Sequence, residues 1–260
     1  MPRRAAKSSP PVESAESERL HVRIAHSGVT SRRKAETLIQ EGRVTVNGEI
    51  VMEMGVRVGP DDQVAVDGIP IEVSRQFTVL LNKPKGVVTT MFDPEGRRTI
   101  VSYLPDYGVA LKPVGRLDKD TEGLLLCTND GDLAHRLSHP RYGVEKEYVA
   151  VVVGIPDAKA LDRLRKGIYL EGKKTSPAHV EVIHAEEKSN STGLRLVLHE
   201  GRKRQIRLMC DAVGHPVSSL RRVRIAHLRV KGMRPGECRL LGKQEVDELR
   251  KLVGLAPLYA

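Results

Sequence analysis

The chain has 260 residues, with 43 Lys and Arg against 33 Asp and Glu and a formal net charge of +10. This length allows one or two domains with substantial cores, and the cation excess favours a polyanionic partner such as nucleic acid, although charge alone is also compatible with a solvated surface or an acidic membrane. No apolar run approaches the ~18 residues of a membrane span and no signal-peptide core follows the N-terminus, so we expect a cytoplasmic protein without a membrane partner.

The first part of the chain divides into a tail and a small unit. Residues 1–16 are rich in Ser, Pro, Ala and charge, which cannot bury enough apolar surface to become ordered, and we predict a disordered tail. Residues 17–74 carry the signals of a compact unit. Its predicted elements are a helix at residues 20–26 stopped by Gly28, a second helix capped by Thr30 or Ser31 and ended by Gly42, a hairpin at residues 44–51, and a strand at residues 64–66.

Three cations, Arg32, Arg33 and Lys34, crowd the first turn of the second predicted helix. The helix dipole disfavours cations there, and violations of local preference often mark function, here phosphate contacts; a solvated face explains the charge equally well. Residues 31–35 and 42–48 resemble the alpha-L RNA-binding module shared by a small-subunit ribosomal protein and some tRNA synthetases. The resemblance implies that the three cations bind RNA.

Residues 77–252 read as one mixed α+β domain. Strands are predicted near residues 78–81, 147–153, 178–183 and 194–198, and helices near residues 157–166, 205–213 and 244–253. Residues 124–127 are predicted to form a short buried strand or the start of a helix. The cysteines, Cys127, Cys210 and Cys238, are widely spaced and indicate buried thiols rather than a disulfide framework or a zinc site. Residues 83–86 lack the pattern of a nucleotide-binding P-loop, and we expect no cofactor and no metal.

Residues 115–126 are the most informative stretch, because Asp118 stands beside Arg116 just before an apolar run. The apolar run predicts a buried element, so Asp118 lies on a loop anchored by packed structure, where catalytic groups are usually presented. Turn formation and capping are the commoner roles of Asp118, Asp120 and Thr121 in such a pattern. The spacing alone therefore does not establish catalysis.

Four sequence motifs, taken together and in their order along the chain, favour a catalytic role for Asp118. Residues 81–86, 115–125, 145–148 and 200–207 resemble those of the ribosomal RNA pseudouridine synthases of the RsuA/RluB type, and the resemblance extends over residues 77–230. It implies a central, largely antiparallel mixed sheet crossed by a catalytic cleft. It also implies conversion of a specific uridine of ribosomal RNA, with the large subunit favoured, to pseudouridine. The expected partner is ribosomal RNA or a ribosomal precursor particle, and we expect a monomer.

The resemblance also implies roles for single residues. Asp118 would be the nucleophile, Arg207 would pair with it and favour its ionised form, and Tyr148 would lie against the flipped uracil. Arg116 would fill the gap left in the RNA. Without the resemblance, Tyr148 reads as a core residue and Arg207 as a surface cation.

Two basic clusters follow, at residues 202–204 and 221–224. A minority of their side chains is expected to contact phosphates, and the RNA-binding candidates are Arg202, Arg204 and Arg222. Ala226 stands where glycine is common in the resembled family, which puts one backbone turn in doubt.

Two other classes of function remain open. A non-catalytic RNA-binding or ribosome-assembly factor on the same fold would need the basic clusters but not Asp118. A metal-dependent phosphodiesterase using Asp118 and Asp120 would need further carboxylate or histidine ligands.

Overall fold

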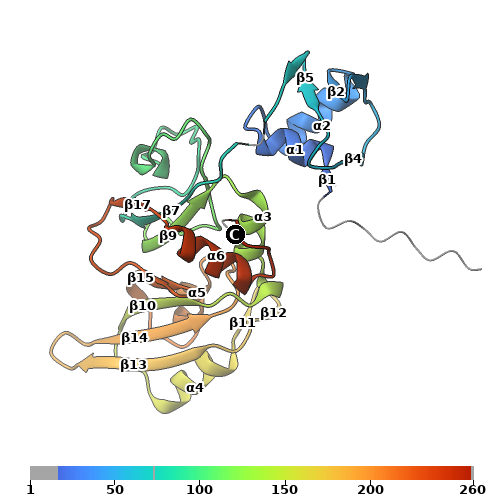
Figure 1. Cartoon of the computed structure of the whole chain (residues 1–260). Coiled ribbons are helices and arrows are strands. Elements are labelled where there is room, and N and C mark those ends of the chain that lie inside the picture. The colour runs from blue at the N-terminus through green and yellow to red at the C-terminus, as the bar shows by residue number, and fades with distance from the viewer. Residues whose placement is uncertain (1–16, 73, 259–260) are drawn as a thin grey trace, which may run out of the picture. The chain divides into compact units, whose positions relative to one another are not determined.

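The computed structural model describes residues 17–72 and 74–258, so the tail predicted at residues 1–16 lies outside the described part of the chain. The chain divides between Arg75 and Gln76 into two compact units, and each is described by itself (Figure 1). Among the described residues, no helix is both long enough and apolar enough to cross a bilayer.

The first unit packs two short helices against a small antiparallel sheet. Its elements are β1 (Glu18–Arg19), α1 (Leu20–His26), α2 (Arg32–Gln40), β2 (Val44–Val46), β3 (Glu49–Ile50), β4 (Arg57–Val58), β5 (Val64–Val66) and β6 (Ile69–Pro70). The strand order in the sheet is β3-β2-β5-β6, and β1 pairs with β4. Leu20, Ile24 and the inward face of α2 share one core with Val44, Val58 and Val64.

Local signals place the elements of this unit. The Ser31 hydroxyl accepts a hydrogen bond from the main-chain N–H of Lys34 at 3.3 Å, so Ser31 caps α2. Asn47 and Gly48 have φ angles of 53° and 87°, which form the tight turn between β2 and β3. The predicted bounds of α1 and β5 are confirmed, and the three cations of residues 32–34 lie exposed on the first turn of α2.

The second unit is built on one large mixed sheet. Its strands are β7 (Thr78–Lys83), β8 (Lys112–Pro113), β9 (Glu122–Thr128), β10 (Lys146–Val153), β11 (Tyr169–Leu170), β12 (Lys173–Lys174), β13 (His179–Glu186), β14 (Ser191–Leu198), β15 (Val217–Ile225), β16 (Leu228–Arg229) and β17 (Cys238–Leu240). Its helices are η1 (Ile100–Tyr103), α3 (Gly131–Ser138), η2 (Pro140–Tyr142), α4 (Ala158–Lys166), α5 (Gln205–Asp211) and α6 (Lys243–Leu252). The main strand order is β13-β14-β10-β15-β9-β7-β17 (Figure 1).

The sheet is antiparallel except where β15 pairs in parallel with β9. That pairing is close: a Cβ atom on Gly123 would lie 2.2 Å from the carbonyl oxygen of Arg222, and Gly123 has a φ angle of 104°. A side chain at Gly123 would therefore separate the two strands. The expected α+β class with a largely antiparallel mixed sheet is confirmed.

Both faces of the sheet are covered, because successive residues of β9 point to opposite sides. Leu125 and Cys127 join a core that includes residues of α4 and α5. Leu124 and Leu126 join a second core that includes residues of α3 and α6. The sheet is therefore a rigid layer, and the loops at its edge are positioned by two cores.

The basic cluster predicted at residues 221–224 is in fact part of β15, in the middle of the sheet. Arg224 pairs with Glu145 and Glu147 instead of projecting as an isolated cation. The turn that follows contains Ala226 with a φ angle of 50°, a conformation that costs an L residue about 1 kcal/mol. This is the turn at which the sequence departs from the glycine of the resembled family.

Candidate active site

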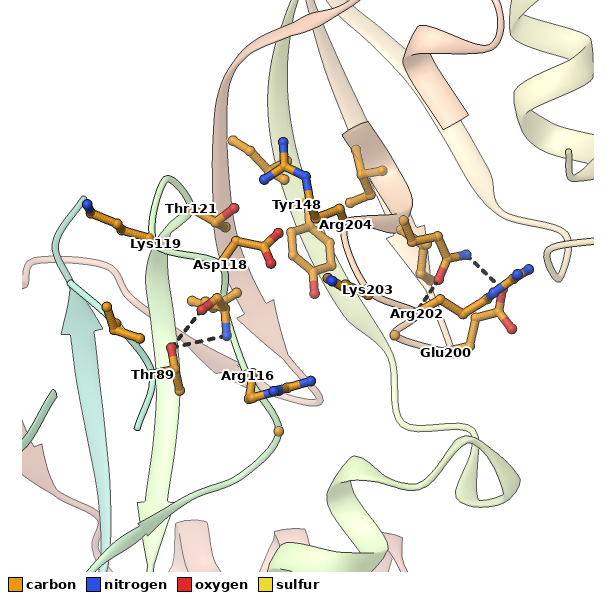
Figure 2. Close-up of a pocket in the computed structure, with 18 of the residues that line it drawn as sticks. Thr89, Arg116, Asp118, Lys119, Thr121, Tyr148, Glu200, Arg202, Lys203 and Arg204 are labelled. Atoms are coloured by element: carbon orange, nitrogen blue, oxygen red, sulfur yellow. Dashed lines mark hydrogen bonds between the residues drawn. The ribbon is translucent and has the colours of Figure 1, made fainter. Parts of the chain in front are cut away.

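A pocket of about 610 Å³ lies where three loops of the second unit meet. They are the loop between β8 and β9, the loop between β14 and α5, and the loop after β7. Its lining includes Thr89, Arg97, Arg116, Asp118, Thr121, Tyr148, Arg202 and Arg204. Figure 2 shows the carboxylate of Asp118 directed toward the ring of Tyr148.

Asp118 lies half-buried between two anchored neighbours. The main-chain carbonyl of Leu117 accepts a hydrogen bond from the Thr89 hydroxyl at 2.7 Å, and the N–H of Leu117 lies 3.3 Å from the same oxygen. On the other side, the N–H of Thr121 donates to the carbonyl of Asp118 at 3.0 Å. These contacts use main-chain atoms, so they hold the segment in place and leave the carboxylate of Asp118 facing the pocket.

Lys83 anchors the segment that contains Asp118 through hydrogen bonds to its main chain. It ends β7, and its side chain is 0 % exposed. Its ammonium group donates to the carbonyl oxygens of Pro84 at 2.9 Å and Thr121 at 2.8 Å, and it lies 3.5 Å from that of Lys119. Burial lowers the pKa of Lys83 to about 8, and the negative charges of Asp118, Asp120 and Glu122 oppose the shift. Lys83 is therefore mainly protonated at neutral pH, and its ammonium group can donate to these main-chain carbonyls.

The lowered pKa of Lys83 predicts a pH dependence of stability. The pKa is lower in the folded state than the 10.5 of a solvated lysine, so between pH 8 and 10.5 the unfolded chain binds more protons and the free energy of unfolding rises with pH. Relative to Lys83→Met, the wild type should gain about 1 kcal/mol between pH 8 and 9. Denaturant unfolding of both proteins at the two pH values measures this gain, because titration of the cysteines is common to both.

Lys146 provides the matched control for Lys83. Burial also lowers the pKa of Lys146 to about 8, but its ammonium group donates to Val144 and not to residues 117–121. Lys146→Met should show the same loss of pH-dependent stability and retain more RNA-modifying activity than Lys83→Met. Equal losses of activity would show that Lys83 has no special role in holding the segment of Asp118.

Tyr148 lies between the pocket and the core. It is buried in β10, belongs to the core that includes α4 and α5, and its ring is part of the pocket wall. Arg222 on the neighbouring strand lies behind it, with its guanidinium carbon 5.9 Å from the ring centre. Tyr148 is therefore a core residue that also contributes to the wall of the pocket.

The prediction that Arg222 contacts RNA phosphate is wrong. The residue is 2 % exposed, and its Nε donates to the carbonyl of Leu124 at 2.7 Å. Its Nη1 lies 3.4 Å from the hydroxyl of Tyr148. A guanidinium enclosed between two strands of the sheet is not accessible to a nucleic acid.

Arg207 is buried, so it is not the surface cation that its helical spacing allowed. Its Nη1 donates to the carbonyl of Val217 at 3.1 Å and its Nη2 to the carbonyl of Asp120 at 3.2 Å. Among the described residues, the structure forms no ion pair between Arg207 and Asp118, and in this respect the expected pairing is not observed. Arg207 instead joins α5 to the main chain of the segment that contains Asp118.

The other arginines that were predicted to bind RNA differ in their contacts. Arg202 is half-buried and donates to the carbonyls of Lys173 and Leu170 at 2.9 and 2.7 Å, so it holds the β11–β12 hairpin. Arg204 is exposed at the start of α5, and its side chain lies in the wall of the pocket with Asp118 and Tyr148 (Figure 2). Arg116 is exposed at the pocket rim.

Sequence reasoning missed the roles of Lys83 and Thr89. Lys83 belongs to the motif at residues 81–86, but its burial follows from contacts with the segment at residues 119–121, 36 to 38 positions away. Thr89 gave no signal, because its contact with Leu117 joins residues 28 positions apart. Among the described residues, no three His, Cys, Asp or Glu side chains form a group that could hold a metal ion.

Comparison with known proteins matches each of the two units to a protein family. Residues 77–212 match the RNA pseudouridylate synthase family, and residues 18–74 match the S4 domain family. The chain is 45 % identical over 235 residues to the ribosomal large subunit pseudouridine synthase B of Bacillus subtilis (strain 168), covering 90 % of this chain and 96 % of that protein. It is 44 % identical over 239 residues to an uncharacterised RNA pseudouridine synthase of Aquifex aeolicus (strain VF5), covering 91 % of this chain and 95 % of the relative.

A solved structure shows the same fold. A crystal structure of a pseudouridylate synthase aligns with a TM-score of 0.63 and 30 % sequence identity, covering 89 % of this chain and 99 % of that chain. The chain belongs to the RNA pseudouridylate synthase family and contains an S4 domain. It is an RNA pseudouridine synthase, an isomerase, and the expected family is confirmed.

Proposed function

We propose that this enzyme converts a specific uridine of large-subunit ribosomal RNA to pseudouridine, with Asp118 as the nucleophile. The observation that supports it most strongly is the placement of Asp118 and Tyr148 in one pocket, in a chain whose relative in Bacillus subtilis is a ribosomal large subunit synthase. The reaction breaks the bond from ribose to a uracil nitrogen and rejoins the base through carbon. It therefore needs a nucleophile and a pocket for a flipped base.

The chain supplies each of these requirements. The carboxylate of Asp118 faces the pocket, and its segment is held by main-chain contacts that do not involve the carboxylate. The ring of Tyr148 offers a flat wall for the extruded uracil. A cation in the pocket favours the ionised carboxylate, and Arg204 is the pocket-lining candidate while Arg207 acts through the main chain. Arg116, which is exposed and lines the pocket, is the proposed contact to the strand from which the base leaves.

The proposed RNA contacts are Arg202, Arg204 and the cations of α2. The setting proposed for the reaction is the cytoplasm, with a monomeric enzyme acting on ribosomal RNA or a ribosomal precursor particle.

An assay of uridine conversion on transcribed large-subunit and small-subunit ribosomal RNA tests the substrate. We expect conversion of large-subunit RNA; conversion of small-subunit RNA alone would overturn the substrate assignment, and tight binding without conversion would favour a non-catalytic binding factor.

The cations of α2 predict the salt dependence of binding. Arg32→Ala combined with Arg33→Ala should weaken RNA binding and reduce the log-log slope against salt by about one to two, because fewer counterions are released. The rate at saturating RNA should change little, since these residues belong to the other unit. Filter binding over a range of salt concentrations, with single-turnover kinetics, measures both effects.

A charge-matched control separates local contacts from net charge. Lys159→Ala with Lys188→Ala removes two exposed cations that do not line the pocket. This double variant should leave the slope nearly unchanged. An equal slope change in both double variants would mean that Arg32 and Arg33 act only through overall charge.

A further inference from the structure

The loop between β7 and η1 forms one wall of the pocket through Val88, Thr89 and Arg97. Thr89 is buried and bonds to both main-chain groups of Leu117, the residue before Asp118. The N–H of Gly86 also donates to the carbonyl of Lys119 at 2.8 Å. The loop is therefore held in a fixed position against the segment that contains Asp118.

The N–H groups at the edges of the Arg97 guanidinium are paired with two carboxylates of the same loop. Its Nε and Nη2 donate to the two carboxylate oxygens of Asp93 at 3.1 and 2.6 Å, and its Nη1 lies 2.9 Å from a carboxylate oxygen of Glu95. Asp93 also accepts the main-chain N–H of Arg97 at 2.8 Å, and its side chain is 4 % exposed. Hydrogen bonds from Arg97 lower the pKa of Asp93, so this pair stays charged at neutral pH.

The flat faces of the Arg97 guanidinium, unlike its edges, remain available to a ligand. The side chain is 40 % exposed and lines the pocket, and among the described residues no aromatic ring stacks on it. The neighbouring Arg98 differs, because its guanidinium carbon lies 4.7 Å from the ring centre of Tyr103. A phosphate approaching the edge of Arg97 would meet two carboxylates, whereas a nucleobase needs only the flat face.

Phe92 adds a second flat surface to the same loop. The residue is 78 % exposed. The Thr90 hydroxyl donates to the carbonyl of Phe92 at 2.7 Å and lies 3.3 Å from its N–H, so a local turn holds the main chain. A large apolar side chain that is exposed on a loop lining the pocket is suited to stacking on a base.

We propose that the loop of residues 88–97 binds unstacked nucleobases of the substrate RNA, with the face of Arg97 at the pocket wall and the ring of Phe92 farther along the loop. The inference rests on the proposed function for the identity of the RNA. It assigns Arg97 to base stacking and not to phosphate binding.

The comparison of Arg97→Ala with Arg97→Lys tests this assignment. The ligand is a transcribed fragment of large-subunit ribosomal RNA that the wild-type protein binds. Both variants should weaken binding by about 5- to 100-fold, because lysine keeps the charge but lacks the planar face. The log-log slope against salt should change by less than about half a unit, since no phosphate contact is lost. Arg97→Lys can keep its ion pair with Asp93, and thermal unfolding verifies that the protein is intact.

Arg98→Ala and Arg98→Lys are the matched controls, because they change the same charge one residue away in a side chain that already stacks on Tyr103. They should bind RNA within about twofold of the wild type. If Arg97→Lys binds like the wild type and Arg97→Ala lowers the slope by about one, Arg97 contacts phosphate and the proposal is wrong. Wild-type affinity in both Arg97 variants would also overturn it.

A fluorescence titration tests Phe92 directly, because the chain contains no tryptophan. The emission of Phe92→Trp should be quenched as the RNA fragment saturates the protein, whereas that of Leu252→Trp on α6 should not change. Unchanged emission of Phe92→Trp at saturation would remove Phe92 from the proposal. These binding measurements do not depend on turnover, so a wild-type protein that forms no pseudouridine would refute the proposed function and leave the stacking result readable.

Discussion

Replacement of Asp118 by asparagine should reduce pseudouridine formation by at least about a thousandfold, because an amide of the same shape is not a nucleophile. RNA affinity should stay within a few fold of the wild type. The segment is held by Thr89, Lys83 and Thr121 through main-chain atoms, and none of these contacts uses the carboxylate that is changed. Single-turnover kinetics with a ribosomal RNA fragment, with affinity measured in parallel, gives both quantities.

Asp120 is the matched control for this experiment. It lies two residues away and is exposed, and it does not line the pocket. Asp120→Asn should retain most of the wild-type rate. Substantial turnover by Asp118→Asn without added metal would remove Asp118 from the chemistry, and a loss of wild-type activity in EDTA would support the metal-dependent alternative.

Replacement of Arg207 by alanine should lower the rate by about a hundredfold or more at neutral pH. The guanidinium is buried and donates to the carbonyls of Val217 and Asp120, so its loss removes two hydrogen bonds and releases the segment of Asp118. Arg207→Lys should retain some activity, because one ammonium group keeps the charge but cannot reach both carbonyls in the same geometry. Rates measured from pH 5 to 9 for both variants test this prediction.

Arg204→Ala separates a cation that lines the pocket from one that acts through the main chain. Loss of Arg204 should lower the rate at saturating RNA and leave the unfolding temperature nearly unchanged, because its side chain is exposed in the pocket wall. Loss of Arg207 should lower both the rate and the unfolding temperature, because it removes two buried hydrogen bonds to main-chain carbonyls. Normal turnover by Arg207→Ala at neutral pH would show that the buried arginine is not needed for catalysis.

The elements set by local signals were predictable from the sequence. The bounds of α1 and β5 follow from apolar spacing, the start of α2 from the cap at Ser31, and the first hairpin from Asn47 and Gly48. Each of these signals acts over a few residues, so it can be read from the sequence without knowledge of the tertiary contacts. The family motifs supplied the class of the second unit and the placement of Asp118 and Tyr148.

The features that depend on distant contacts were not predictable in this way. Arg222 appeared as a surface cation because its burial depends on the pairing of β15 with β10 and β9, which brings together strands far apart in the sequence. The main-chain partners of Arg207 and Lys83 are likewise set by tertiary packing. A basic residue in a strand has the same local pattern whether it points to solvent or to a carbonyl inside the sheet.

The most direct test is the mapping of pseudouridines in ribosomal RNA from cells that contain or lack this protein, with wild-type or Asp118→Asn protein restored to the deficient cells. We expect a specific pseudouridine in large-subunit RNA to disappear without the protein, to return with the wild type, and not to return with Asp118→Asn. Restoration of that pseudouridine by Asp118→Asn, or an unchanged map in cells that lack the protein, would contradict it.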